Sequence, residues 1–141
     1  MAITWQTSLF TGIEIVDEQH KRIFAKFDEF FEACDHGAAG QDLECLLTYL
    51  KDYTQVHFHD EEDYMAGALY PEFGRHRELH RKFITDLSVL DKEIGQEGEV
   101  RQIHILTTKR LLIRWFIQHI RLEDRNFAAY LVEQNSFPTS P

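Results

Sequence analysis

Hydrophobic residues recur at steps of three and four along four stretches of the chain, and short breaks separate these stretches. Such spacing places the apolar side chains on one face of a helix. The breaks contain glycine or proline, as in HGAAG at 36–40 and GQEG at 95–98. We predict an irregular arm at 1–16, a frayed tail at 134–141, and helices at about 17–35, 41–66, 71–94 and 99–133.

The connections between the predicted helices are short, so sequential helices must lie antiparallel to one another. The expected fold is therefore all-α, an up-down-up-down four-helix bundle, with Asp17 capping the first helix. The chain has 141 residues, the size of one ordinary domain, and shows no internal repeat or domain boundary. We expect a single domain over residues 1–141.

Composition narrows the classes of function. A formal net charge of −9 makes nucleic acid and anionic membrane surfaces poor partners. No stretch approaches about 18 consecutive apolar residues, and the N-terminus lacks a basic segment followed by an apolar run, so we expect neither a transmembrane helix nor a signal peptide. Cys34 and Cys45 form no CxxC motif or disulfide framework. We expect a cytoplasmic protein with two reduced thiols.

Seven side chains that can bind metal fall in or near the hydrophobic stripes of the predicted helices. Pairs four residues apart in sequence project from one helix face, one turn apart. In the alternating topology, the four places that carry these side chains converge at the same end of the bundle. The seven candidates are His20, His57, Glu61, His76, His80, His119 and Asp124.

A single histidine on an apolar face is usually a core residue with a hydrogen-bond partner, but that explanation fails for the whole set. Each unsatisfied buried polar group costs roughly 1–3 kcal/mol, and charged groups cost more. Seven of them would consume much of a typical stability of about 5–15 kcal/mol. A metal converts this cost into binding free energy. We predict that three histidines are not ligands: His59 faces away from the core, His36 lies in the first break, and His104 lies some four turns from His119 along the helix axis. We also predict that Glu62, off the face of Glu61, is solvated.

The number and type of side chains indicate the metal. Seven ligands exceed the usual four of a zinc site and suit two metals that share carboxylate bridges. Imidazole favours iron, zinc, copper or nickel, and histidine with carboxylate but no thiolate fits a non-haem di-iron centre. Five histidines to two carboxylates donate less charge than the glutamate-rich di-iron enzymes do, which disfavours high-valent oxidation chemistry.

Four segments resemble the hemerythrin family, in particular the single-domain bacteriohemerythrins. They are DEQH ending at His20, HFHDEEDYM from His57, HRELH at 76–80, and WFIQHIRLED at 115–124. The resemblance implies reversible dioxygen binding at a non-haem di-iron centre, for oxygen storage, transport or delivery.

The resemblance also implies a role for each ligand. His76, His80 and His119 would bind one iron ion, and His20 and His57 would bind the other. Glu61 and Asp124 would bridge both ions, together with an oxo or hydroxo group. The iron ion with two histidines would keep an open position for dioxygen.

Helix geometry does not settle the second carboxylate. Glu123 lies four residues after His119 and is better aligned with it, whereas Asp124 lies five residues after, about 140° around an α-helix. The resemblance points to Asp124, and we follow it.

An apolar pocket should surround the open position, because a dry site slows the loss of reduced oxygen species. Our candidates are Ile23, Trp115 and Phe116, each about one turn from a ligand. Family members often have leucine where Phe116 stands, so this residue would alter access to the centre. Simple core packing is the alternative explanation for these three residues.

The family implication leaves more than one function open. We expect a binding protein and not an enzyme, acting as a monomer, with dioxygen as ligand and oxygen-requiring enzymes as recipients. The alternatives are an oxygen or redox sensor, and a di-iron enzyme acting on peroxide or nitric oxide.

Overall fold

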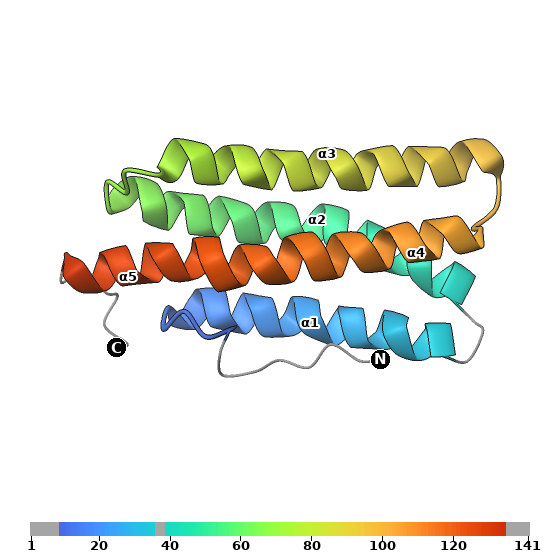
Figure 1. Cartoon of the computed structure of the whole chain (residues 1–141), viewed down its shortest axis with the longest axis horizontal. Coiled ribbons are helices and arrows are strands. Elements are labelled where there is room, and N and C mark those ends of the chain that lie inside the picture. The colour runs from blue at the N-terminus through green and yellow to red at the C-terminus, as the bar shows by residue number, and fades with distance from the viewer. Residues whose placement is uncertain (1–8, 36–38, 135–141) are drawn as a thin grey trace.

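A computed structural model describes residues 9–35 and 39–134 of the chain. The helices form four rods that lie side by side, and each rod runs antiparallel to the one before it in sequence (Figure 1). The predicted up-down-up-down four-helix bundle is therefore confirmed. None of the described helices is both long enough and apolar enough to span a membrane. The first three rods are α1 (Glu14–Asp35), α2 (Ala39–Gly67) and α3 (Phe73–Glu97), and the fourth consists of α4 (Gln102–Arg110), η2 (Leu111–Ile117), η3 (Ile120–Asp124) and α5 (Arg125–Glu133).

The hydrophobic stripes of the sequence are the inner faces of the rods. In α3, the buried residues follow one another at steps of three and four: His76, His80, Phe83, Leu87, Leu90 and Ile94. The buried face of α2 is a broad band, because a helix in a bundle packs against two neighbours. There, Tyr53 and Tyr64 are only half-buried, while Leu43, Leu47 and Phe58 are buried.

The first helix begins three residues earlier than expected, so residues 14–16 belong to α1 and not to the arm. Asp17 was expected to precede the first turn of the helix as its N-terminal cap. It lies within the first turn instead, and its side chain binds the residues before the helix. Its carboxylate accepts hydrogen bonds from the backbone N–H and the hydroxyl of Thr11, at 2.8 and 2.9 Å, and from the Gly12 N–H at 3.1 Å. These bonds fold the preceding segment back onto the helix. Residues 1–8 of the predicted arm and residues 135–141 of the predicted tail lie outside the described residues.

The third connection differs from the expected one at both ends. Helix α3 runs through Gly95 to Glu97 and ends where Gly98 adopts φ +75°, a left-handed conformation that suits glycine at a helix end. The fourth rod begins at Gln102 because His104 fixes its start. The Nδ1 atom of His104 accepts a hydrogen bond from the Arg101 N–H at 2.9 Å, and its Nε2 atom lies 2.7 Å from Glu97. His104 therefore joins the end of α3 to the start of α4.

Two segments of the fourth rod, η2 and η3, are π-helical, which the sequence periodicity did not indicate. In a π-helix, each N–H bonds to the carbonyl five residues earlier instead of four. The rod is therefore wider here, and residues five apart come closer to alignment. Such segments are rare and often occur at functional sites.

Replacing Asp17 by alanine should lower the free energy of unfolding by about 1–2 kcal/mol, the usual cost of losing a helix-capping side chain. Three hydrogen bonds from Thr11 and Gly12 would lose their acceptor. Denaturant unfolding followed by circular dichroism measures the change. The matched control is Glu18→Ala, which removes an exposed side chain paired with Lys21 and should cost less than about 0.5 kcal/mol. Equal losses in the two variants would contradict the capping role.

Candidate metal centre

The seven candidate side chains meet inside the bundle, and all of them are buried, with exposed fractions between 0% and 6%. They form two overlapping groups, in each of which the potential ligand atoms lie within 4.8 Å of one another. We call Glu61, His76, His80, His119 and Asp124 the three-histidine group, and His20, His57, Glu61 and Asp124 the two-histidine group. The two carboxylates belong to both groups.

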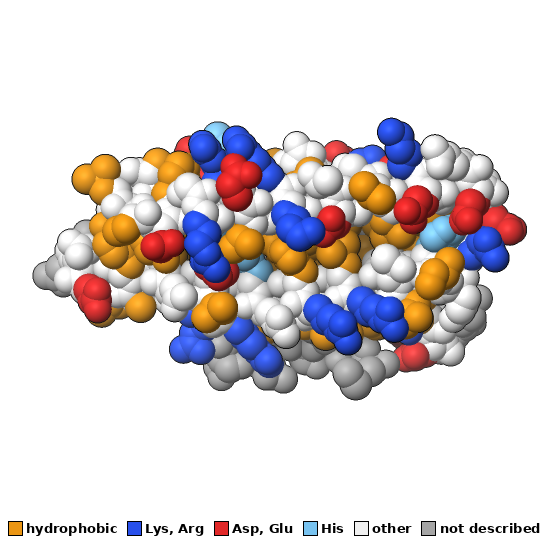
Figure 2. Space-filling model, turned by 45° about the horizontal axis from the view of Figure 1, so that its top comes forward, with side chains coloured by type: hydrophobic (Ala, Val, Ile, Leu, Met, Phe, Trp, Pro, Cys, Tyr) orange, Lys and Arg blue, Asp and Glu red, His pale blue; other side chains and the backbone are white. Residues whose placement is uncertain are grey.

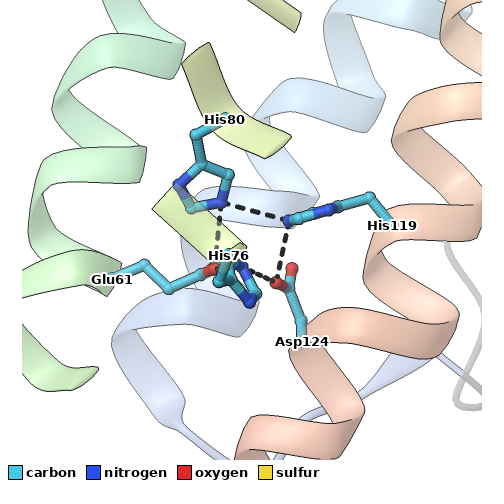
Figure 3. Close-up of side chains that lie close together, drawn as sticks. All are labelled: Glu61, His76, His80, His119 and Asp124. Atoms are coloured by element: carbon cyan, nitrogen blue, oxygen red, sulfur yellow. Dashed lines mark hydrogen bonds and ion pairs between the residues drawn. The ribbon is translucent and has the colours of Figure 1, made fainter. Parts of the chain in front are cut away.

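The side chains of the three-histidine group turn their ligand atoms toward a common point (Figure 3). The Nε2 atom of His76 lies 2.8 Å from Oε1 of Glu61 and 3.1 Å from Oδ1 of Asp124. His119 Nε2 lies 3.2 Å from the same Asp124 oxygen, and His80 Nε2 lies 3.4 Å from the same Glu61 oxygen. The Nε2 atoms of His80 and His119 are 3.1 Å apart.

In the two-histidine group, the other oxygen of each carboxylate faces the histidines. His20 Nε2 lies 3.2 Å from Oδ2 of Asp124 and 4.0 Å from Oε2 of Glu61. His57 Nε2 lies 3.5 Å from the same Glu61 oxygen. Each carboxylate thus presents one oxygen to each group, which is the disposition of a bridging ligand.

The carboxylates are close to nitrogen atoms but are not satisfied by them. Within residues 9–35 and 39–134, neither oxygen of Glu61 nor of Asp124 has a hydrogen bond of normal geometry, and the same holds for both ring nitrogens of His76. Leaving buried polar atoms unsatisfied costs about 1–3 kcal/mol each. A cation between the converging lone pairs would satisfy them. The donor set therefore fits a metal.

Burial and mutual proximity set the charges of the cluster. Burial lowers the pKa of His57 to about 3, and the neighbouring His20 adds to this effect. Burial and Asp124 would raise the pKa of Glu61, but the adjoining nitrogens of His76 and His80 outweigh them and lower it to about 2. Burial opposes protonation of His76, yet Asp124 and Glu61 raise its pKa to about 10. Metal binding would displace the proton that His76 holds.

Gln19, a residue that the sequence analysis missed, orients His57. The Nδ1–H group of His57 donates to the Gln19 amide oxygen at 2.7 Å, while the Gln19 amide nitrogen donates to Asp60 at 2.8 Å. Because Asp60 engages the nitrogen of the amide, the oxygen faces the imidazole. The proton of neutral His57 therefore lies on Nδ1, and the Nε2 lone pair points toward the cluster.

Glu62 has the same function for His80, so the prediction that Glu62 is solvated is wrong. The Nδ1–H group of His80 donates to Glu62 Oε2 at 2.8 Å, and the Glu62 side chain is only 21% exposed. Glu62 does not lie on the buried face of α2, but its side chain extends to His80 on the neighbouring helix α3. Histidines that bind metals usually donate their other N–H group in this way, which fixes the ring.

The histidines predicted not to be ligands lie outside both groups where the structure describes them. His59 is 73% exposed and pairs with Asp63 at 3.3 Å. His104 belongs to the connection between α3 and α4. His36 lies outside the described residues.

The structure turns Asp124 into the cluster and Glu123 away from it. Both carboxylate oxygens of Glu123 accept hydrogen bonds from the Arg75 guanidinium, at 2.6 and 2.9 Å. The alignment argument favoured Glu123 because it assumed an α-helix. Since η3 is π-helical, Asp124 is brought toward His119 despite the separation of five residues. That Asp124 binds the metal stays a prediction.

The predicted pocket residues Trp115 and Phe116 contact each other, with ring centroids 6.1 Å apart, but they face different groups of the cluster. Ile23 and Phe116 are fully buried, and the Phe116 ring lies 6.3 Å from the ring of His20 in the two-histidine group. Trp115 lies on the other side, stacked on His119 at 4.5 Å with an interplanar angle of 8°. Adjacent residues on a helix point in different directions, so Trp115 and Phe116 contact different groups.

The fold and the buried cluster define a metal-binding four-helix bundle protein. Residues 11–131 match the family model described as hemerythrin HHE cation binding domain. The chain therefore belongs to the hemerythrin family.

Known members of this family are similar over most of their length. The bacteriohemerythrin of Pseudomonas aeruginosa is 32% identical over 134 residues, covering 89% of this chain and 78% of the relative. That of Methylococcus capsulatus is 29% identical, covering 92% and 96%. A crystal structure of a hemerythrin point mutant has a TM-score of 0.73 and 28% identity, covering 93% of this chain and 98% of that chain.

Replacing Asp124 by alanine should remove metal from the protein, whereas Glu123→Ala should retain it. Asp124 belongs to both groups of potential ligands, while Glu123 binds Arg75. Metal per chain, measured by mass spectrometry after purification and desalting, distinguishes the two variants. Loss of metal only in Glu123→Ala would overturn the assignment.

Replacing Glu62 by alanine should weaken metal binding by about 10–100-fold, because loss of such a partner leaves the ligand histidine poorly oriented. The His80 Nδ1–H group would lose its acceptor. Competition with a chelator of known affinity measures the change. Asp63→Ala, which removes an exposed neighbouring carboxylate, is the control and should leave affinity unchanged. A similar loss in both variants would count against an orienting role.

Proposed function

We propose that this protein binds dioxygen reversibly at a non-haem centre of two iron ions, for oxygen storage, transport or delivery. The observation that carries the proposal is the pair of overlapping groups that share Glu61 and Asp124. His76, His80 and His119 would hold one ion, and His20 and His57 would hold the other. The two carboxylates, with an oxo or hydroxo group, would bridge them.

The two groups differ in the number of side chains, and this difference supports ligand binding. One group has five residues and the other has four. The two-histidine group therefore has room for an external ligand. When bound, two ferrous ions would supply the electrons for reversible dioxygen binding. Histidine nitrogen and carboxylate oxygen without thiolate suit iron in this role.

The surroundings of the two-histidine group favour binding over further chemistry. Phe116 packs on His20 and contacts the rings of Phe24 and Phe27, and all three phenylalanines are buried. These rings exclude water and carry no acid–base group, so they would protect a bound ligand from protonation. Gln19 and Asp60 hold His57 with its lone pair toward the centre. We therefore propose a binding protein, which would supply dioxygen to oxygen-requiring enzymes.

An oxygen titration of the reduced protein tests this function. The iron-loaded protein is reduced without air, freed of reductant, and followed by visible absorbance as dioxygen is added and then removed. We expect a coloured form that appears with oxygen and bleaches when oxygen is withdrawn, over repeated cycles. Zinc-loaded protein is the control and should stay colourless, because zinc has no redox chemistry.

Other results would point to the alternatives. Rapid turnover with peroxide or nitric oxide, without reversible colour, would favour a di-iron enzyme. A protein that purifies with zinc alone would contradict the proposal.

A further inference from the structure

We propose that a cavity between α3 and the fourth rod binds a reduced flavin nucleotide, whose electrons reach the metal centre through Trp115. This inference rests on the proposed function, because it requires redox-active metal ions. A centre that binds dioxygen needs a way to return to the ferrous state whenever it is oxidised. The cavity lies on the side of the centre where such an electron donor has access.

The cavity has a volume of about 430 Å³, which is within the range of small-molecule sites. Its apolar lining comes from Val89 and Leu90 of α3 and from Leu111 and Trp115 of η2. On the face formed by α3 and the fourth rod, exposed hydrophobic side chains form a band with lysine and arginine on both sides (Figure 2). An apolar lining suits a planar aromatic ring system.

A single side chain separates this cavity from the metal centre. Trp115 lines the cavity, and its ring stacks on His119 of the three-histidine group, with ring centroids 4.5 Å apart and an interplanar angle of 8°. Phe83 stacks on the same indole at 4.4 Å and holds it in place. The indole and imidazole rings thus give a continuous π contact from the cavity to a predicted ligand.

The two-histidine group lies away from this cavity. Neither His20 nor His57 lines the cavity, and Phe116 covers His20 from within the core. The proposed oxygen position, at the two-histidine group, would therefore lie on a different side of the centre from the cavity. A donor in the cavity would not compete with dioxygen.

Two arginine side chains in the cavity wall could recognise the phosphate of the nucleotide. Arg110 and Arg114 line the same wall of the cavity, one turn apart, and the ion pairs of the described chain include neither of them. On the opposite wall, Asp86 is paired with Lys82 at 3.4 Å, and Glu93 lies nearby. Guanidinium groups bind phosphate with paired hydrogen bonds. A planar ring with a phosphate tail fits this combination.

The redox step balances with a flavin hydroquinone as donor. The hydroquinone loses two electrons and two protons and becomes the oxidised flavin. Two ferric ions held by the proposed ligands would each take one of these electrons and become ferrous. The two protons pass to solvent at the open side of the cavity.

Titration with flavin mononucleotide tests the binding step on the protein as purified, with equilibrium dialysis as readout. The double variant Arg110→Gln/Arg114→Gln should bind at least about tenfold more weakly, because charge-assisted hydrogen bonds to the phosphate are lost. The matched control, Lys92→Gln/Arg121→Gln, removes two exposed charges that do not line the cavity and should bind like the unchanged protein. Absence of binding, or equal binding in the two double variants, would overturn the proposal.

Reduction kinetics test the role of Trp115. The ferric protein is reduced anaerobically with flavin hydroquinone or with dithionite, a small reductant that does not need the cavity. Trp115→Leu should slow the flavin reaction several-fold more than the dithionite reaction, and Trp115→Phe should restore most of the flavin rate. Equal slowing with both reductants would mean a structural role only and would overturn the electron route.

The binding experiment separates this inference from the proposed function. A protein that binds flavin at the arginine wall but shows no reversible oxygen colour would refute the function and leave the flavin site standing. A protein that binds oxygen reversibly but takes up no flavin would refute the inference alone.

Discussion

The structure depends on keeping two carboxylates and five imidazoles together away from water. These side chains form a polar layer between two hydrophobic clusters, a large one that includes Phe83 and Phe116 and a smaller one that includes Met65 and Phe127. Buried ionised carboxylates are stable only with compensating partners. The nitrogen atoms around Glu61 and Asp124 lower the pKa of both carboxyls, yet the oxygens lack hydrogen bonds of normal geometry. A cation bound here would therefore connect the two clusters of the core, so that metal binding would add directly to the stability of the fold.

Helix periodicity was enough to predict the bundle and most of the cluster, because phase on a helix is a local property of the sequence. It placed His76 and His80 on the buried face of α3 and turned His59 outward, as the structure shows. The short connections predicted the topology, since they require sequential helices to be antiparallel neighbours. The predicted start of α1 was wrong because the residue type of Asp17 does not show which backbone groups its carboxylate binds. In the structure, it binds Thr11 and Gly12.

The remaining errors arise where helices depart from ideal geometry or touch each other. The π-helical η3 changes the angle between His119 and Asp124, and no hydrophobic pattern marked that change. Gln19 and Glu62 contact histidines on neighbouring helices, so their function depends on distances between rods. Helical phase predicted Glu62 to be solvated and gave no role to Gln19. The polar residues next to a predicted ligand are therefore the ones for which a sequence argument is weakest.

The two sides of the centre differ in chemistry as well as in ligand number. On one side, His57 donates to the neutral amide of Gln19, and the buried Phe116 ring packs against His20. On the other, His80 donates to the carboxylate of Glu62, and Trp115 connects His119 to a surface cavity. A carboxylate acceptor makes a ligand histidine more basic than an amide does, so the three-histidine side is the more electron-rich. Trp115 and Phe116 are consecutive residues of the π-helical η2, and their side chains point in different directions, one to each group. One short segment of the fourth rod therefore contacts both groups, through a buried phenylalanine on one side and through an indole that also lines a surface cavity on the other.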